Sequence, residues 1–191
     1  MSRTSGAELL VVAGPSGVGK STVVREVVEL RPDVWLSVSA TTREQRPGET
    51  AGIDYVFMSR PEFETLATSG GFLESAEYAG NLYGTPREPV LSRLANGQDV
   101  ILEIELQGAR QVKAAFPEAI TVFLEPPSLT ELHRRLAGRG TEDESVIRRR
   151  EEVAKTELAA ASEFDYRVKN TDVVPTAHQL IRLIDGSAAS G

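Results

Sequence analysis

A glycine-rich octapeptide near the N-terminus reads Gly14-Pro15-Ser16-Gly17-Val18-Gly19-Lys20-Ser21 and matches the pattern G-x-x-x-x-G-K-[ST]. The apolar run from Leu9 to Ala13 precedes it and is typical of a strand buried on both faces. After it, the valines of residues 23–28 recur on one side of a helix pattern. In this order, backbone N–H groups and the positive end of the helix converge on an anion. The sequence therefore predicts a phosphate-binding loop, the P-loop.

Two side chains of the P-loop are suited to a nucleoside triphosphate. Lys20 can reach the β- and γ-phosphates, and the Ser21 hydroxyl can bind Mg²⁺. The alternative is a glycine-rich turn with a solvated lysine, which the flanking strand and helix patterns disfavour. The motif names a superfamily and leaves the substrate open.

Further strands and helices alternate along the chain. Residues 100–104, 119–124 and 166–170 read as strands, and a hydroxyl stands three residues before glutamate at Ser59, Thr85, Ser128 and Thr141. Such pairs can form capping boxes at helix starts. Alternating strands and helices imply an α/β fold, a parallel sheet flanked by helices. Residues 39–84 interrupt the alternation and look like an inserted lobe.

Composition limits the class of protein. The chain has 191 residues, 40% of them hydrophobic, a formal net charge of −7, no cysteine and two histidines. We expect one domain without disulfides, and we expect no nucleic-acid partner because that function needs a basic face. The longest apolar run is too short for a bilayer, and Met1 to Gly6 lacks an apolar signal region. We therefore expect a cytoplasmic protein without a membrane partner.

Glu103 and Glu105 stand two residues apart on a predicted buried strand, so both are expected on one face. Carboxylates there need cations or polar partners. Mg²⁺ near Ser21 is one candidate, and ion pairing at the strand end is the alternative.

The segments after the P-loop resemble guanylate kinases. The resemblance rests on residues 37–43, 46–49, 52–55, 72–74, 80–85, 103–108 and 135–142, and on Arg150. It covers the chain from Leu9 to about Asn170. It implies a P-loop NTPase-type fold and an enzyme that transfers the γ-phosphoryl group of ATP to GMP, and to dGMP, with Mg²⁺. Within one domain (1–191), we expect a core of 7–38, 85–131 and 153–186 and a GMP-binding lobe (39–84). Residues 132–152, with glycines at 138 and 140, are expected to form a mobile helical lid, and a static, charge-rich helical hairpin is the alternative. The small and polar residues 187–191 are expected to form a disordered tail.

The resemblance also assigns site residues. The catalytic cations would be Lys20, Arg43, Arg135, Arg139 and Arg150. ATP would be bound by Gly14, Pro15, Ser16, Gly17, Val18, Gly19, Lys20, Ser21 and Thr22, with Ser21 serving Mg²⁺. GMP would be bound by Ser39, Arg43, Arg46, Glu49, Tyr55, Glu74, Tyr83, Thr85, Glu103 and Glu105. The family usually has aspartate where this chain has Glu105, which leaves the role of Glu105 open.

The chemistry of these residue types fits the assignments. Guanine presents two adjacent donors to which an ionised Glu74 can accept hydrogen bonds, whereas adenine presents an acceptor at N1. Arginines match phosphate oxygens with paired donors. Each residue also has a plainer interpretation: Arg43 and Arg46 as loop charges, the tyrosines as core aromatics, and Thr85 as a helix N-cap.

Two other functions remain as alternatives. A guanylate-kinase-like binding module would not need an active P-loop, and a related kinase would use another nucleoside monophosphate. No general base stands out in the motifs, and none is required, since a phosphomonoester with a second pKa of about 6 is already largely deprotonated at neutral pH. The arginine-rich end of the lid is a further candidate for nucleic acid, but acidic residues surround it.

Overall fold

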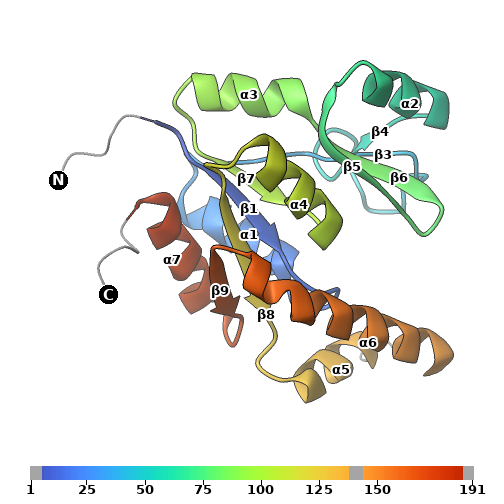
Figure 1. The fold of residues 1–191 in the computed structure, drawn as a ribbon, viewed down its shortest axis with the longest axis vertical. Helices are drawn as coiled ribbons and strands as arrows, with labels where there is room; N and C mark the ends of the chain where they lie inside the picture. Colours follow the sequence, from blue (N-terminus) through green and yellow to red (C-terminus); the bar gives the residue numbers. More distant parts are fainter. Residues whose placement is uncertain (1–5, 138–143, 187–191) are drawn as a thin grey trace.

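The computed structural model describes residues 6–137 and 144–186, with residues 136–137 and 144–151 described by their backbone alone (Figure 1). The strands are β1 (Leu9–Ala13), β2 (Trp35–Leu36), β3 (Ala40–Thr41), β4 (Val56–Phe57), β5 (Phe72–Tyr78), β6 (Asn81–Pro86), β7 (Val100–Glu103), β8 (Ile120–Glu125) and β9 (Tyr166–Lys169). The helices are α1 (Lys20–Leu30), α2 (Arg60–Thr68), α3 (Arg87–Ala95), α4 (Leu106–Ala115), α5 (Leu129–Ala137), α6 (Glu144–Ala159) and α7 (Val173–Ile184), and a 3₁₀ turn, η1 (Ala160–Glu163), follows α6.

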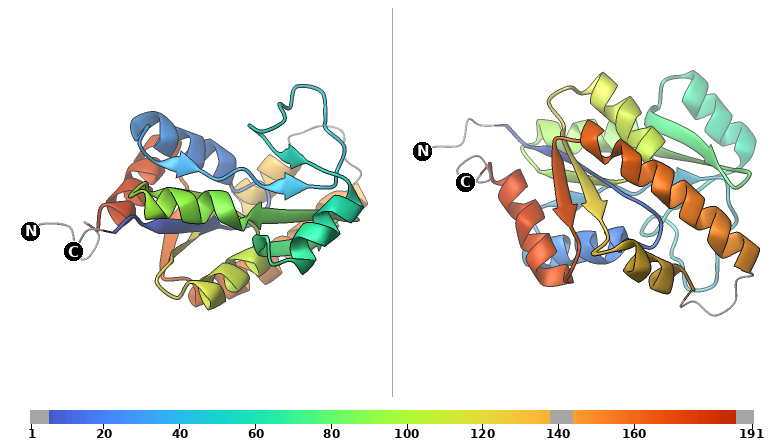
Figure 2. Two further views of the ribbon diagram at one scale, coloured as in Figure 1. Left: turned by 90° about the horizontal axis from the view of Figure 1, so that it is seen from above. Right: turned by 60° about the horizontal axis from the view of Figure 1, so that its bottom comes forward.

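A five-stranded parallel sheet in the order β2-β7-β1-β8-β9 forms the centre of the fold. Side chains of β1 alternate between its two faces: Leu10 and Val12 pack with α1 and α7, whereas Leu9 and Val11 pack with α3 and α4. Seen edge-on, α1 and α7 lie on one side of this sheet and α4 on the other (Figure 2, left). The predicted α/β fold with a helix-flanked parallel sheet is confirmed.

A second sheet, in the order β4-β3-β6-β5, lies at the end of the molecule away from both termini (Figure 1). One of its faces packs on α2, where the rings of Phe63 and Phe72 stack with centroids 4.3 Å apart. Gly84 lies beneath them, since a Cβ there would meet Phe72 at 2.9 Å and Phe63 at 3.1 Å. The polar face of the same sheet is therefore left for other contacts.

Helix starts agree with the capping prediction at two sites and disagree at a third. Ser59 and Glu62 form a full capping box, and the Ser128 hydroxyl accepts the Glu131 N–H at 3.1 Å. Thr85 is not a cap: it belongs to β6, α3 begins two residues later, and its hydroxyl donates to Glu74 instead. Thr141 lies outside the described residues.

The prediction that Glu103 and Glu105 share one strand face is wrong. Strand β7 ends at Glu103, where its pairing with β1 reaches Val12, and β1 then turns into the P-loop. Glu105 lies beyond the strand as the N-cap of α4, with 54% of its side chain exposed. The two carboxylates consequently serve different neighbours.

The middle of the predicted lid, residues 138–143, and the predicted tail, residues 187–191, lie outside the described residues. The predicted lid begins in α5 and ends in α6. These two helices are in contact, and the buried side chains of Leu132 and Ala154 pack together between them. Among the described residues, no helix is both long enough and apolar enough to cross a membrane.

Phe63→Ala is expected to destabilise the second sheet. The ring is 2% exposed, and truncating a buried phenylalanine costs about 3–5 kcal/mol because of lost burial and the cavity left behind. Hydrogen exchange should accelerate in residues 40–86 more than in β1. Leu91→Ala on the surface of α3 is the control, with an effect within about 0.5 kcal/mol. Equal acceleration in both sheets would contradict a separate packing unit around Phe63.

Candidate active site

The P-loop turns sharply at glycines that no other residue can replace without strain. Gly14, Gly17 and Gly19 have φ values of 151°, 82° and 97°. A Cβ at Gly14 would lie 2.5 Å from the Leu124 carbonyl oxygen, so the turn also needs the space. Gly19 ends the loop as the N-cap of α1, which directs the first-turn N–H groups of that helix toward the loop.

Lys20 folds back across the P-loop. Its Nζ donates to the Gly14 carbonyl oxygen at 2.6 Å and lies 3.6 Å from Glu105 Oε1. The residue is only 9% exposed, so its ammonium charge is held in a weakly solvated position. This arrangement keeps a cation at the loop, where phosphate oxygens would gather.

Ser21 and Glu103 form the oxygen-rich side of the loop. The Ser21 hydroxyl donates to Glu103 Oε1 at 2.6 Å, from the first turn of α1 to the end of β7. Hydroxyl and carboxylate oxygens are ligands that Mg²⁺ prefers, so these residues fit the expected ion. The described residues include no cluster of three acidic, histidine or cysteine side chains suited to hold a metal alone.

The Val18 carbonyl of the P-loop accepts hydrogen bonds from two distant elements. Arg135 Nη1 of α5 donates at 3.1 Å, and Asn170 Nδ2, just after β9, donates at 2.8 Å. Asn170 is 3% exposed, and its Oδ1 accepts the Thr176 hydroxyl at 3.2 Å. The structure thus places Arg135 at the loop. This role of Asn170 was not predicted, because no local sequence pattern links residues 152 positions apart.

Glu157 of α6 is a second residue at the P-loop that was not predicted from the sequence. Its carboxylate accepts the backbone N–H of Ser16. The pKa of Glu157 is raised to about 7, mainly by burial and in part by the nearby Glu105 carboxylate, while Lys20 and the Ser16 N–H oppose the shift. An isolated glutamate in a charged helix gives no signal of this position in the sequence.

Arg43 is the centre of a cluster on the second sheet and its loop. Its guanidinium pairs with both Glu49 oxygens, at 2.7 and 3.1 Å, and lies 5.3 Å from the Tyr55 ring centroid. The bond to Glu49 raises the pKa of Arg43, and a hydrogen bond with Tyr83 adds to the shift. Burial is the main cause of the raised pKa of Tyr55. Arg46 is exposed, and its backbone N–H donates to Glu49 at 2.8 Å.

Glu74 and Thr85 lie opposite each other on the polar face of the second sheet. The Thr85 hydroxyl donates to Glu74 Oε1 at 2.7 Å. Thr85 is 0% exposed and Glu74 is 7% exposed. Continuing the register of β3 and β6, in which Ala40 faces Gly84, by one residue brings Ser39 opposite Thr85. Burial is the main cause of the raised pKa of Glu74, and Glu105 contributes. The three predicted base-reading residues therefore lie in one row.

Two predicted cations cannot be placed. Arg139 lies outside the described residues, and Arg150 is described only by the α6 backbone.

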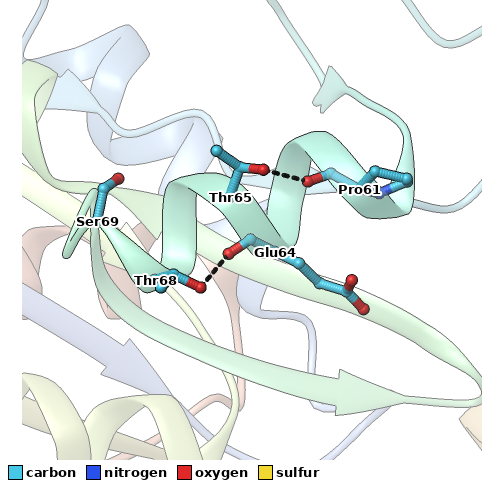
Figure 3. Close-up of a pocket in the computed structure, with 5 residues that line it drawn as sticks. All are labelled: Pro61, Glu64, Thr65, Thr68 and Ser69. Carbon is cyan, nitrogen blue, oxygen red and sulfur yellow. Dashed lines mark hydrogen bonds between the residues drawn. The ribbon is translucent and has the colours of Figure 1, made fainter.

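A hollow on α2 offers no alternative site (Figure 3). Its hydroxyls bond within the helix, from Thr65 to the Pro61 carbonyl at 2.8 Å and from Thr68 to the Glu64 carbonyl at 2.7 Å.

The loop and sheet define the class: the chain is an α/β protein of the P-loop NTPase type. The family model for guanylate kinase matches residues 6–187. A guanylate kinase from Thermobifida fusca is 60% identical over 176 residues, 92% of this chain and 90% of that protein. One from Streptomyces coelicolor is 58% identical over 175 residues, 92% and 89% of the two chains. This chain belongs to the guanylate kinase family.

Solved structures agree with this family. The crystal structure of guanylate kinase from Anaplasma phagocytophilum superposes with a TM-score of 0.80 at 31% identity and covers 98% of this chain and 89% of its own. Shikimate kinase from Acinetobacter baumannii, at a TM-score of 0.52 and 15% identity, shares the fold alone.

Glu157→Gln is expected to stabilise the protein more at pH 8 than at pH 5. A carboxyl whose folded pKa is about 7 and whose ordinary value is 4.5 favours folding below the lower value, and this contribution is lost as pH rises through about 7. Glutamine keeps an oxygen for the Ser16 N–H without the charge. The gain should fall short of about 1.4 kcal/mol per unit of pKa shift, because part of the side chain remains in water.

Thermal denaturation at the two pH values measures this effect. Glu152→Gln on the same helix is the control, since that carboxylate is exposed and pairs with Lys155 at the surface. Equal gains for the Glu157 variant at both pH values would contradict a charge buried against the P-loop.

Proposed function

We propose that this chain catalyses transfer of the γ-phosphoryl group of ATP to GMP, giving ADP and GDP. The observation that carries the proposal is the position of Glu103 between two anion sites. Its carboxylate accepts a hydrogen bond from the Ser21 hydroxyl of the P-loop. The same carboxylate contributes to the raised pKa of Tyr55, which belongs to the Arg43 cluster. Arg25 Nη2 of α1, 3.6 Å from Asp54 Oδ1, also joins the P-loop helix to the loop beside Tyr55.

The acceptor site combines a phosphate end and a base end. Arg43, with Tyr55, Tyr83 and Arg46, would hold the GMP phosphate, once the phosphate replaces Glu49 on the guanidinium. Glu74 would accept the N1–H and the exocyclic amine of guanine, with Thr85 and Ser39 beside it. Both ends lie on one sheet, which supports a single nucleotide lying along its polar face.

Repulsion between the two nucleotides is the main obstacle to reaction. Two like charges about 4 Å apart repel by roughly 4 kcal/mol at an effective dielectric of 20, and several such pairs arise when ATP meets GMP. Lys20 and Arg135 at the P-loop, together with Arg43, would offset this repulsion as an oxygen of the GMP phosphate attacks in line. No side chain needs to remove a proton, because that phosphate is already largely ionised.

Magnesium would be held beside Ser21 with the nucleotide phosphates and water, and Glu103 is within hydrogen-bond distance of that hydroxyl. When bound, the ion would neutralise phosphate charge. The remaining P-loop residues, from Gly14 to Thr22, would hold the ATP phosphates through backbone N–H groups.

The division of the chain belongs to the same proposal. Residues 39–84 would form the GMP-binding lobe, and residues 132–152 a lid that brings Arg139 and Arg150 to the transition state and excludes water. Use of dGMP and a cytoplasmic location complete it, with ATP and GMP as small-molecule partners. A pure binding module is disfavoured by the intact P-loop lysine and serine.

Steady-state kinase assays with each nucleoside monophosphate test the proposal. GMP should be the preferred acceptor, and Lys20→Ala should lower kcat by about 10²- to 10³-fold, since one cation is lost from the transferring phosphoryl group. Thermal denaturation controls for folding of the variant. Absence of GDP from ATP, GMP and Mg²⁺ would overturn the proposal, and better use of AMP or UMP would replace GMP as the acceptor.

Glu74→Gln should raise the KM for GMP about 10- to 100-fold, as expected for the loss of a charged hydrogen-bonding partner, and leave the KM for ATP unchanged. The wild-type KM for GMP should also rise toward acidic pH, because the raised pKa of Glu74 lets the carboxylate take up a proton earlier than usual. The GMP phosphate titrates too, so the difference between the wild-type and variant pH profiles isolates Glu74. Identical profiles would remove Glu74 from base recognition.

A further inference from the structure

Gly108 of α4 faces the Glu74 carboxylate so closely that only a hydrogen fits between them. A Cβ at this position would lie 2.5 Å from Glu74 Oε2, 3.0 Å from its Cδ and 3.3 Å from its Cγ. These are the three nearest atoms outside the helix's own backbone, and all belong to the one side chain. Anything larger than glycine would therefore displace the carboxylate.

The helix itself gives no reason for glycine at this position. Gly108 lies in the first turn of α4, inside the range Leu106–Ala115, and its φ is not positive. Glycine is the least favoured helix residue after proline, because it loses the most backbone freedom on folding. A residue that opposes its local structure points to a requirement elsewhere.

The contact completes a clamp around Glu74. The Thr85 hydroxyl donates a hydrogen bond of 2.7 Å to Oε1. The other oxygen, Oε2, lies against Gly108, where a Cβ would come too close. Helix α4 packs along β5, so the carboxylate lies between the strand that carries it and the helix.

We propose that Gly108 is a specificity-determining positioning residue, which sets the place of the Glu74 carboxylate and thereby the preference for guanine. This inference rests on the base-reading role of Glu74 in the proposed function. Gly108 touches no substrate: it acts by leaving room for the carboxylate between α4 and β5. A displaced carboxylate would no longer meet both donors of guanine.

Gly108→Ala is the test, because it should change the recognition of GMP far more than the stability of the protein. Alanine favours the helix more than glycine does, which opposes the cost of displacing the carboxylate, so Tm should change little. The kcat/KM for GMP should fall about 10- to 100-fold, mainly through KM, while the KM for ATP stays unchanged. The preference for GMP over IMP, which lacks the exocyclic amine, should shrink. Arg110→Ala, an exposed change on the same helix, should alter none of these values.

A double variant separates the inference from the proposal beneath it. If Glu74 reads guanine and Gly108 acts through it, adding Gly108→Ala to Glu74→Gln should change the KM for GMP little beyond the single glutamine variant. An effect of Glu74→Gln without an effect of Gly108→Ala would overturn the inference alone. Unchanged GMP kinetics in Glu74→Gln would overturn the base-reading role. A lower Tm with loss of both substrates in Gly108→Ala would make the glycine purely structural.

Discussion

The backbone of the P-loop passes so close to the strand and loop beside it that side chains are excluded from the turn. At Gly14 the neighbour is the carbonyl of Leu124, and at Gly19 a Cβ would meet Asn170 Nδ2 at 2.8 Å. Both positions also need positive φ, so shape and conformation agree. The orientation of Lys20 and Ser21 follows from this turn, because α1 begins where it ends. Phosphate binding thus depends on close packing at the ends of β1 and β8.

On the proposed function, one face of the second sheet contributes to stability and the other to recognition of the base. Alternation along β6 sends Thr85 to the polar face and Gly84 to the aromatic pair under α2. Burial of Glu74 then has two effects of opposite value. It costs free energy to ionise the carboxylate, but a polar group in a dry site rejects a mismatched base far better than an apolar pocket does.

Local patterns in the sequence were sufficient for the P-loop, the central strands and the Ser59 cap, because each depends on neighbours within a few residues. They failed where the chain is joined over long distances. Asn170 meets Val18 from the far end of the chain, and only the assembled sheet brings them together. Glu105 was misplaced because β7 ends where β1 leaves it without a partner, an event that residues 100–105 do not encode. The roles of the site residues stay predictions.

The pairing of Arg43 with Glu49 has a consequence for the cell's own anions. A phosphate that binds the guanidinium would compete with a carboxylate that already makes two hydrogen bonds to it. Inorganic phosphate would compete through this contact alone, whereas GMP, on the proposed function, would also bind through its guanine. On the proposed function, the ion pair between Arg43 and Glu49 would therefore weaken the binding of small oxyanions more than that of a whole nucleotide.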